Sequence, residues 1–184
     1  MPNMLGKDRA LELLHKYVKS ENLIKHSIAS GLIMESLAEP FLDIPKDHAE
    51  IIGLLHDLDF DMTREEPKKH GLIAADILST EDIPDEYIYA IKAHNEENGT
   101  LRKSSLDYAL SAGETITGLI VATALVYPDK KISSVKPKSI IKRMKSSAFA
   151  RNISRENIRQ CEKFGCDLNR FIEISLYAMK DFEI

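Results

Sequence analysis

The decisive stretch of this sequence is IIGLLHD at residues 51–57, an apolar run that ends in an imidazole and a carboxylate. These two groups together suit divalent ions of intermediate softness, such as zinc, manganese or iron. Adjacent residues of a helix point in different directions, so both side chains reach one ion more easily where the helix ends. The following run, LDFD at residues 58–61, is typical of such a turn. We therefore predict a helix that ends near Leu55 beside a metal site.

The composition is that of one globular domain. The chain has 184 residues, of which 43% are hydrophobic and 29% charged, enough to bury a core without disulfides or metals. No stretch approaches the roughly 20 apolar residues of a membrane span, and the first residues lack the apolar core of a signal peptide. We expect a cytoplasmic protein with no membrane association. Two cysteines, Cys161 and Cys166, are too few for a disulfide framework.

The net charge of −4 is unevenly distributed along the chain. Residues 1–128 carry 12 Lys/Arg against 22 Asp/Glu (−10), whereas residues 129–170 carry 12 against 4 (+8). An acidic body with a basic segment could bind a cation beside an anionic substrate, although the basic segment could equally be a solvated helix. With a pI near 5.9 and few aromatic residues, we expect no nucleic-acid partner.

The hydrophobic periodicity is helical almost throughout. The predicted helices cover residues 8–19, 22–39, 45–56, 67–78, 83–94, 104–127 and 137–145, and two more begin after the N-caps Ser154 and Asp167. We find no alternating β pattern of useful length and no internal repeat. The predicted fold class is therefore all-α, as a single-domain helical bundle over residues 1–184.

Three further histidines lie on an otherwise apolar face or near a predicted helix end. His26 lies beside the apolar stripe of the second helix, His70 in the first turn of the fourth, and His94 at the end of the fifth. Each could be a metal ligand, or a hydrogen-bonded core or surface histidine. His15 and His48 lie among charged residues, and we assign them no role.

An acidic residue on the apolar helix 104–127 is a further candidate. Glu114 has Leu110 one turn before it and Gly118 one turn after, and a carboxylate there is costly to bury without a cation or a proton. Asp107 lies roughly 10 Å away on the same face, and in the first turn it favourably meets the helix dipole. We select Glu114 as the ligand and keep Asp107 as the alternative.

The order His26, then His56-Asp57, then an acid on a later apolar helix resembles the HD superfamily of metal-dependent phosphohydrolases. The similarity covers most of residues 10–165 and leaves helices at about 154–182 as the C-terminal part. It implies a helical bundle around one or two divalent ions (Mn, Fe, Zn, Ni, Co or Mg). The implied ligands of the first ion are His26, His56, Asp57 and Glu114. His70 and His94 resemble the extra histidines of two-metal members. The resemblance implies that Asp57 of this chain is able to bridge the two ions.

The sequence departs from the family pattern in two places. The last ligand is usually Asp, whereas Glu114 is one methylene longer. Many two-metal phosphodiesterases of the family carry a lysine shortly after the HD pair, whereas this chain has Asp59 and Asp61, and it also lacks their Gly-Tyr-Pro element. This difference argues against a cyclic-dinucleotide phosphodiesterase.

The predicted reaction is hydrolysis of a phosphate ester of a nucleotide or another small phosphorylated metabolite. The predicted catalytic residues are Asp57, which would orient the attacking water, and Asp59 or Asp61, as general base, second-sphere partner or simple turn residues. Candidate phosphate contacts, which could also be solvated surface, are Arg64, Lys68 and Lys69 after the HD pair and Lys142, Arg143 and Lys145 in the basic helix. The alternatives are a di-iron oxygenase of the same fold and a non-catalytic nucleotide-sensing module. Oligomeric state stays open.

Overall fold

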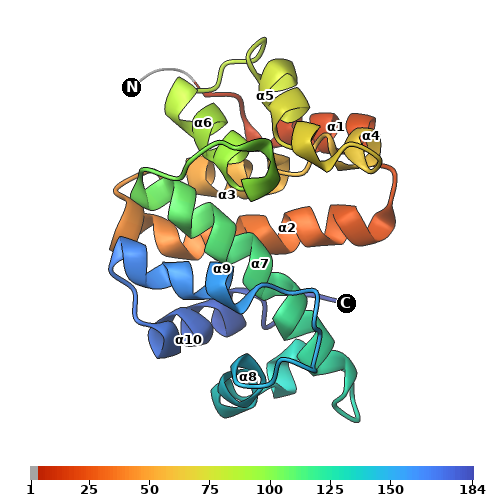
Figure 1. Cartoon of the computed structure of the whole chain (residues 1–184), viewed down its shortest axis with the longest axis vertical. Coiled ribbons are helices and arrows are strands. Elements are labelled where there is room, and N and C mark those ends of the chain that lie inside the picture. Colours follow the sequence, from red (N-terminus) through yellow and green to blue (C-terminus); the bar gives the residue numbers. More distant parts are fainter. Residues whose placement is uncertain (1–3) are drawn as a thin grey trace.

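A computed structural model describes residues 4–184, which form a helical bundle with no strand in that range (Figure 1). The helices are α1 (Lys7–Tyr17), α2 (Glu21–Leu37), α3 (Lys46–Leu55), α4 (Phe60–Thr63), α5 (Leu72–Leu78), α6 (Asp85–Ala93), α7 (Ser105–Leu125), α8 (Pro137–Met144), α9 (Arg155–Arg159) and α10 (Leu168–Ala178). Short 3-10 turns lie at Pro67–Lys69, Glu96–Asn98, Ile132–Ser134 and Gln160–Phe164, and a π turn at Ala38–Leu42. The predicted all-α class is confirmed.

The closest helix packing in the fold is the crossing of α2 and α3. A Cβ added at Gly53 would lie 2.6 Å from the backbone nitrogen of Gly31 and 2.7 Å from the carbonyl carbon of Ser30. The two helices therefore touch backbone to backbone, which only glycine permits at this point. The apolar residues of α3 around the crossing are all buried. As a result, the end of α3 is held at a fixed place beside α2.

Helix α7 is the central helix of the bundle and packs against α2, α6, α8 and α9 (Figure 1). Its N-terminus is fixed by a capping box, in which Ser104 and Asp107 satisfy each other's backbone N–H groups. Contrary to the sequence-based expectation, α7 is long and apolar enough, by length and composition, to span a membrane. Most of it, however, is buried inside the bundle, as is usual for a core helix of a globular domain.

The chain after α3 differs from the prediction of a fourth helix starting at Pro67. The residues from Pro67 form a single 3-10 turn, His70 is extended, and Gly71 has a φ of +85° before α5 begins. The cause is Asp59, whose carboxylate accepts the backbone N–H groups of Gly71 and Ala74 at 2.8 and 2.9 Å. His70 consequently lies in a connecting segment rather than in the first turn of a helix.

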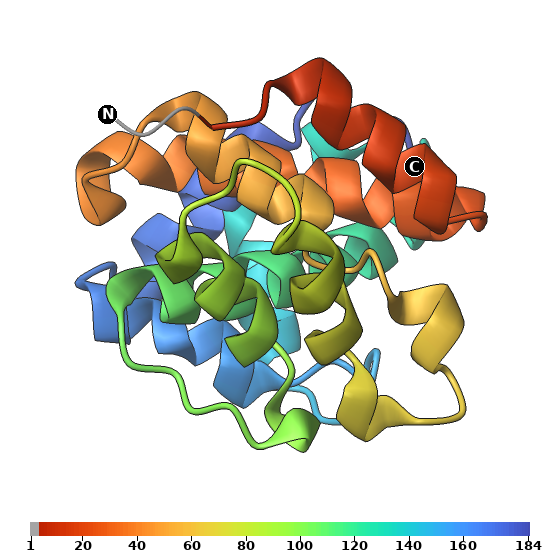
Figure 2. The same cartoon turned by 90° about the horizontal axis from the view of Figure 1, so that it is seen from above.

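The remaining elements follow the predicted ranges to within a few residues. Seen from above, α5 and α6 lie side by side (Figure 2), and α6 continues into His94 as its C-cap. Ser154 and Asp167 cap α9 and α10 with their side chains, as predicted. The C-terminal helices cover the side of α7 that faces away from α5, so that α7 is enclosed and the ends of α3 and α6 stay near it.

The crossing of α2 and α3 predicts an unusual response to Gly53→Ala. Replacing a mid-helix glycine by alanine normally stabilises a helix by about 0.5–1 kcal/mol. Here the added Cβ overlaps backbone, so we expect the free energy of unfolding to fall by about 1–3 kcal/mol, measured by urea denaturation. Gly6→Ala is the control, since no atom lies within 4 Å of its Cβ position. A Gly53→Ala protein as stable as wild type would contradict this close packing.

Candidate metal centre

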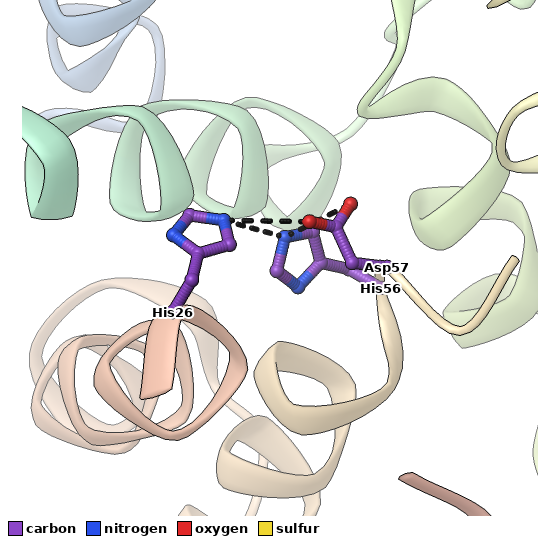
Figure 3. A group of neighbouring side chains, drawn as sticks. All are labelled: His26, His56 and Asp57. Carbon is purple, nitrogen blue, oxygen red and sulfur yellow. Dashed lines mark hydrogen bonds and ion pairs between the residues drawn. The ribbon is translucent and has the colours of Figure 1, made fainter. Parts of the chain in front are cut away.

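The first group of candidate ligands consists of His26, His56 and Asp57 (Figure 3). The Nε2 atoms of His26 and His56 are 3.2 Å apart. Asp57 Oδ2 lies 3.5 Å from His26 Nε2, and Asp57 Oδ1 lies 3.4 Å from His56 Nε2. Donors bound to one ion at about 2.1 Å are separated by about 3 Å, so the two imidazole nitrogens and the Asp57 carboxylate have the spacing of a ligand set.

A second group shares the same carboxylate and consists of Asp57, His70 and His94. The Nε2 atoms of His70 and His94 are 2.9 Å apart. Asp57 Oδ1 lies 3.2 Å from His70 Nε2 and 3.4 Å from His94 Nε2. Asp57 is thus shared by both groups, in the position of a carboxylate that could bridge two ions.

The second nitrogen of each imidazole is held by an acceptor, which fixes the ring. His56 Nδ1 lies 2.7 Å from the carbonyl oxygen of Gly53, and His94 Nδ1 lies 2.6 Å from that of Ile91. A carbonyl only accepts, so both Nδ1 atoms carry the proton. In the neutral rings, the Nε2 atoms therefore present lone pairs to the centre of the site.

The same assignment follows for the other two histidines. His70 Nδ1 lies 2.8 Å from the carboxylate of Asp59. His26 Nδ1 lies 2.9 Å from the hydroxyl of Thr117, which donates its own proton to the carbonyl of Glu114 and so accepts from the ring. Such outer partners orient the ligands of metal sites and set their tautomers.

The four Nε2 atoms therefore meet in two pairs in which neutral rings would oppose lone pair to lone pair. Neither nitrogen of such a pair can donate, so the pair cannot form a hydrogen bond. A cation, either a proton or a metal ion, has to lie between them. The donor set of imidazole and carboxylate fits a divalent metal ion.

The electrostatics of the site show the same need for positive charge. Burial lowers the pKa of His56 to about 3, against the attraction of Asp57, so this imidazole stays neutral. Burial also acts to raise the pKa of Asp57, but the surrounding histidines hold it well below its usual range. Burial opposes protonation of His70, yet hydrogen bonds to Asp57 and Asp59 raise its pKa to about 10. The buried carboxylate of Asp57 is therefore ionised and attracts a cation.

The structure separates the two acids of α7 that the sequence left as alternatives. Glu114 Oε2 lies 3.8 Å from His26 Nε2, and burial raises the pKa of this carboxyl. Asp107 instead accepts the backbone N–H groups of Lys103 and Ser104 at the start of the helix. Of the two, only Glu114 faces the histidines, at the edge of the first group.

The two acids after the HD pair have different places. Asp59 is fully buried, and its two oxygens accept hydrogen bonds from His70 Nδ1 and from two backbone N–H groups. It therefore positions a candidate ligand rather than facing a substrate. Asp61 points away, because its carboxylate accepts the backbone N–H of Lys19 and pairs with Arg64. The geometry gives neither acid the place of a general base.

A cavity of about 530 Å³ opens beside the two groups of candidate ligands. Its wall includes five of the six candidate ligands, together with residues that the sequence did not single out: Leu23, Phe60, Asn95, Glu96, Glu97, Asn152 and Asn157. These residues lie on α2, α4 and α9 and on the turns and loops between helices, and they meet only in the folded chain. Among the residues lining this cavity there is no Lys or Arg.

The loop that brings Asn152 to the cavity is held by one side chain. Arg155 donates to the carbonyl oxygens of Ala150, Ile153, Arg143, Ser146 and Phe149. An arginine fork that satisfies several carbonyls in this way fixes the path of the backbone. Asn152 and Asn157 stand on either side of Arg155, and both line the cavity.

The predicted phosphate contacts lie elsewhere. Arg64 pairs with Asp61 and Lys69 with Glu66, each three residues apart along the chain. Helix α8, which carries Lys142 and ends before Lys145, packs on the distal half of α7 and on α10 (Figure 1). The residues concerned, none of which lines the cavity, are Arg64, Lys68, Lys69, Lys142, Arg143 and Lys145. All of them are exposed except Arg143, which is half-buried.

Comparison with known proteins assigns the family. The HD domain model matches residues 23–124, more than half of the chain. The chain therefore belongs to the HD domain family, a family of metal-dependent phosphohydrolases, and the resemblance stated above is confirmed. The matched range contains all six candidate metal ligands. Among solved structures, none gives a significant match.

The curated relatives that match are ribonucleases by name. Ribonuclease Y of Nitratidesulfovibrio vulgaris is 33% identical over 108 residues, which is 58% of this chain and 20% of that protein. Ribonuclease Y of Lawsonia intracellularis is 30% identical over 108 residues, and that of Desulfotalea psychrophila 31% over 98 residues. This chain thus covers about a fifth of the length of these relatives.

The hydrogen bond between His26 and Thr117 predicts a role for a residue that touches no ion. Thr117→Val keeps the shape but leaves His26 Nδ1 without its acceptor, so we expect metal affinity to fall by about 10–100-fold, measured by competition with a chelating dye. Thr123→Val is the matched control on the same helix, because its hydroxyl bonds only the carbonyl of Leu119. Equal affinities in the two variants would remove Thr117 from the site.

Asp59 and Asp61 offer a second paired test. In Asp59→Asn an amide replaces a carboxylate with three donors around it, so we expect a loss of about 1–3 kcal/mol in stability and a fall in metal stoichiometry, measured by elemental analysis. Asp61→Asn loses only an exposed pair and should keep its metal content. Full metal content in Asp59→Asn, or its loss in Asp61→Asn, would reverse the assignment.

Proposed function

We propose that this protein hydrolyses a small phosphate ester, such as a nucleotide or another phosphorylated metabolite, at a centre of one or two divalent ions. The observation that carries the proposal is the shared carboxylate of Asp57 between two pairs of opposed imidazole nitrogens. Membership of the HD domain family supports the reaction class. The identity and number of the ions belong to the proposal.

The residues of the chain have separate tasks in this proposal. His26, His56 and Asp57 would hold one ion, with Glu114 at its edge, and Asp57, His70 and His94 would hold the other. A bound ion supplies Lewis acidity, which brings the pKa of water toward about 7 and withdraws charge from phosphate oxygens. Asn152 and Asn157 present neutral amides on the cavity wall, where they could donate to phosphate oxygens without adding charge.

RNA is the competing substrate class, because the relatives are named ribonucleases. Proteins that bind single-stranded nucleic acid line their groove with basic residues along the phosphate backbone. Here the cavity has no Lys or Arg among its lining residues, and Glu96 and Glu97 lie on its wall. This charge distribution supports a substrate with one phosphate group at the ions over a polyanion.

A second candidate reaction is oxidative cleavage at a di-iron centre. The observation in its favour is the close grouping of four histidines with the carboxylates of Asp57 and Glu114, because such mixed ligands also suit iron. Iron retained after anaerobic purification, with oxygen uptake on adding substrate, would support this reaction. Metal-stimulated release of phosphate without oxygen would support hydrolysis.

Hydrolysis is tested with the ion-loaded full chain. Protein loaded with Mn²⁺ should release nitrophenol from p-nitrophenyl phosphate or its diester, and a chelator should abolish the activity. His56→Ala should lose most bound metal and at least about 100-fold of the rate, because an interior ligand is removed. His15→Ala, an exposed histidine of α1, is the matched control and should keep both.

Three results would contradict the proposal. The first is wild-type metal content in His56→Ala. The second is no turnover of either nitrophenyl ester, or of a small panel of nucleotides, with Mn²⁺, Co²⁺, Ni²⁺ or Fe²⁺, which would favour a nucleotide-sensing module. The third is faster cleavage of a short RNA than of every small ester. This result would make RNA the substrate class, while the reaction would still be phosphate-ester hydrolysis.

A further inference from the structure

A second cavity, of about 400 Å³, lies beside the metal centre between α2, α7 and the segment after α10. Its walls are mostly apolar and include Ala29, Val121, Leu125, Phe182 and Ile184. The polar side chains at this cavity are few, and Lys25 is the one basic residue among those that line it. The cavity is therefore chemically opposite to the acidic cavity over the ions.

The two cavities are neighbours that share a wall residue. His26 lines both of them, and it also lines a narrower space of about 310 Å³ together with Glu114 and Gly118. Gly118 borders the apolar cavity as well, one helical turn after Glu114. A Cβ at Gly118 would lie 3.0 Å from Ile153 Cδ1, so glycine keeps this junction from being filled by a side chain. The candidate ligands and the apolar walls are therefore adjacent along α7.

The segment after α10 forms one wall of the apolar cavity. A backbone hydrogen bond from Phe182 to Met179 turns the chain back after the helix, and both Phe182 and Ile184 pack half-buried against the core. Opposite them, Leu125 remains half exposed at the end of α7. Apolar surface left open next to a polar centre is the usual composition of a small-molecule site.

Resting on the proposed function, we infer that the apolar cavity binds the body of the phosphate ester while its phosphate lies at the ions. The ligand class is a small ester with one aromatic or alkyl group of about the size of a single ring system. A volume of about 400 Å³ lies within the range of small-molecule pockets. The cavity is a specificity subsite, with Phe182 and Val121 as its contacting walls.

The test measures the binding of two phosphonates to the Mn²⁺-loaded full chain by titration calorimetry. A phosphonate has a carbon–phosphorus bond in place of the ester oxygen and is therefore not hydrolysed. Wild type should bind benzylphosphonate at least about ten-fold more tightly than methylphosphonate, because the ring leaves water. Phe182→Ala and Val121→Asp should each remove most of this ratio and leave the affinity for methylphosphonate within two-fold. Tyr177→Ala, an exposed aromatic residue that lines neither cavity, should keep the full ratio.

The outcomes separate the subsite from the reaction. Equal affinity of wild type for the two phosphonates, or a ratio that survives both substitutions, would overturn the subsite while hydrolysis stands. The expected ratios in a protein that hydrolyses no ester would support the subsite and contradict the proposed function. A short RNA that competes with benzylphosphonate and binds Phe182→Ala and Val121→Asp as well as wild type would overturn the assignment of the cavity to a substrate body.

Discussion

The site depends on the backbone contact between Gly31 and Gly53. Two helices whose facing residues carried side chains would lie further apart, and His26 on one would not meet His56 on the other. Because of this contact, His26 and His56 are neighbours although 30 residues separate them, and their Nε2 atoms lie 3.2 Å apart. Packing in the core of the bundle therefore sets the ligand spacing before any ion binds.

The fold then holds four imidazoles in an arrangement that is unfavourable without a cation. Each Nδ1 is committed to an acceptor of the protein, so the ring cannot turn to relieve the contact between Nε2 atoms. Part of the free energy of folding is thereby stored in the site and recovered when positive charge enters. Buried Asp57, shared by both pairs, adds an attraction that grows as water is excluded.

Sequence reasoning picked out the candidate ligands, which the fold brings close together, because their signals are local. A histidine and an aspartate at the end of an apolar run, and an acid within an apolar helix, are anomalies that composition alone reveals. The roles predicted for Asp59, Asp61 and the lysines do not match their positions in the structure, because these roles depend on which groups surround each side chain in space. Asn152, in a loop, and Asn157, on the short helix α9, carry no sequence signal, since a polar residue at such a position is ordinary until folding brings it to a cavity.

Arg155 has a consequence for how such a scaffold could change. It recognises the loop 143–153 through main-chain oxygens, which every amino acid presents alike. The side chains displayed by that loop can therefore be exchanged while its course is preserved, and the ligands on α2, α3 and α7 need not adjust. A metal site of fixed geometry, facing a loop whose side chains can be exchanged, would let related chains diverge in substrate while they keep the same reaction.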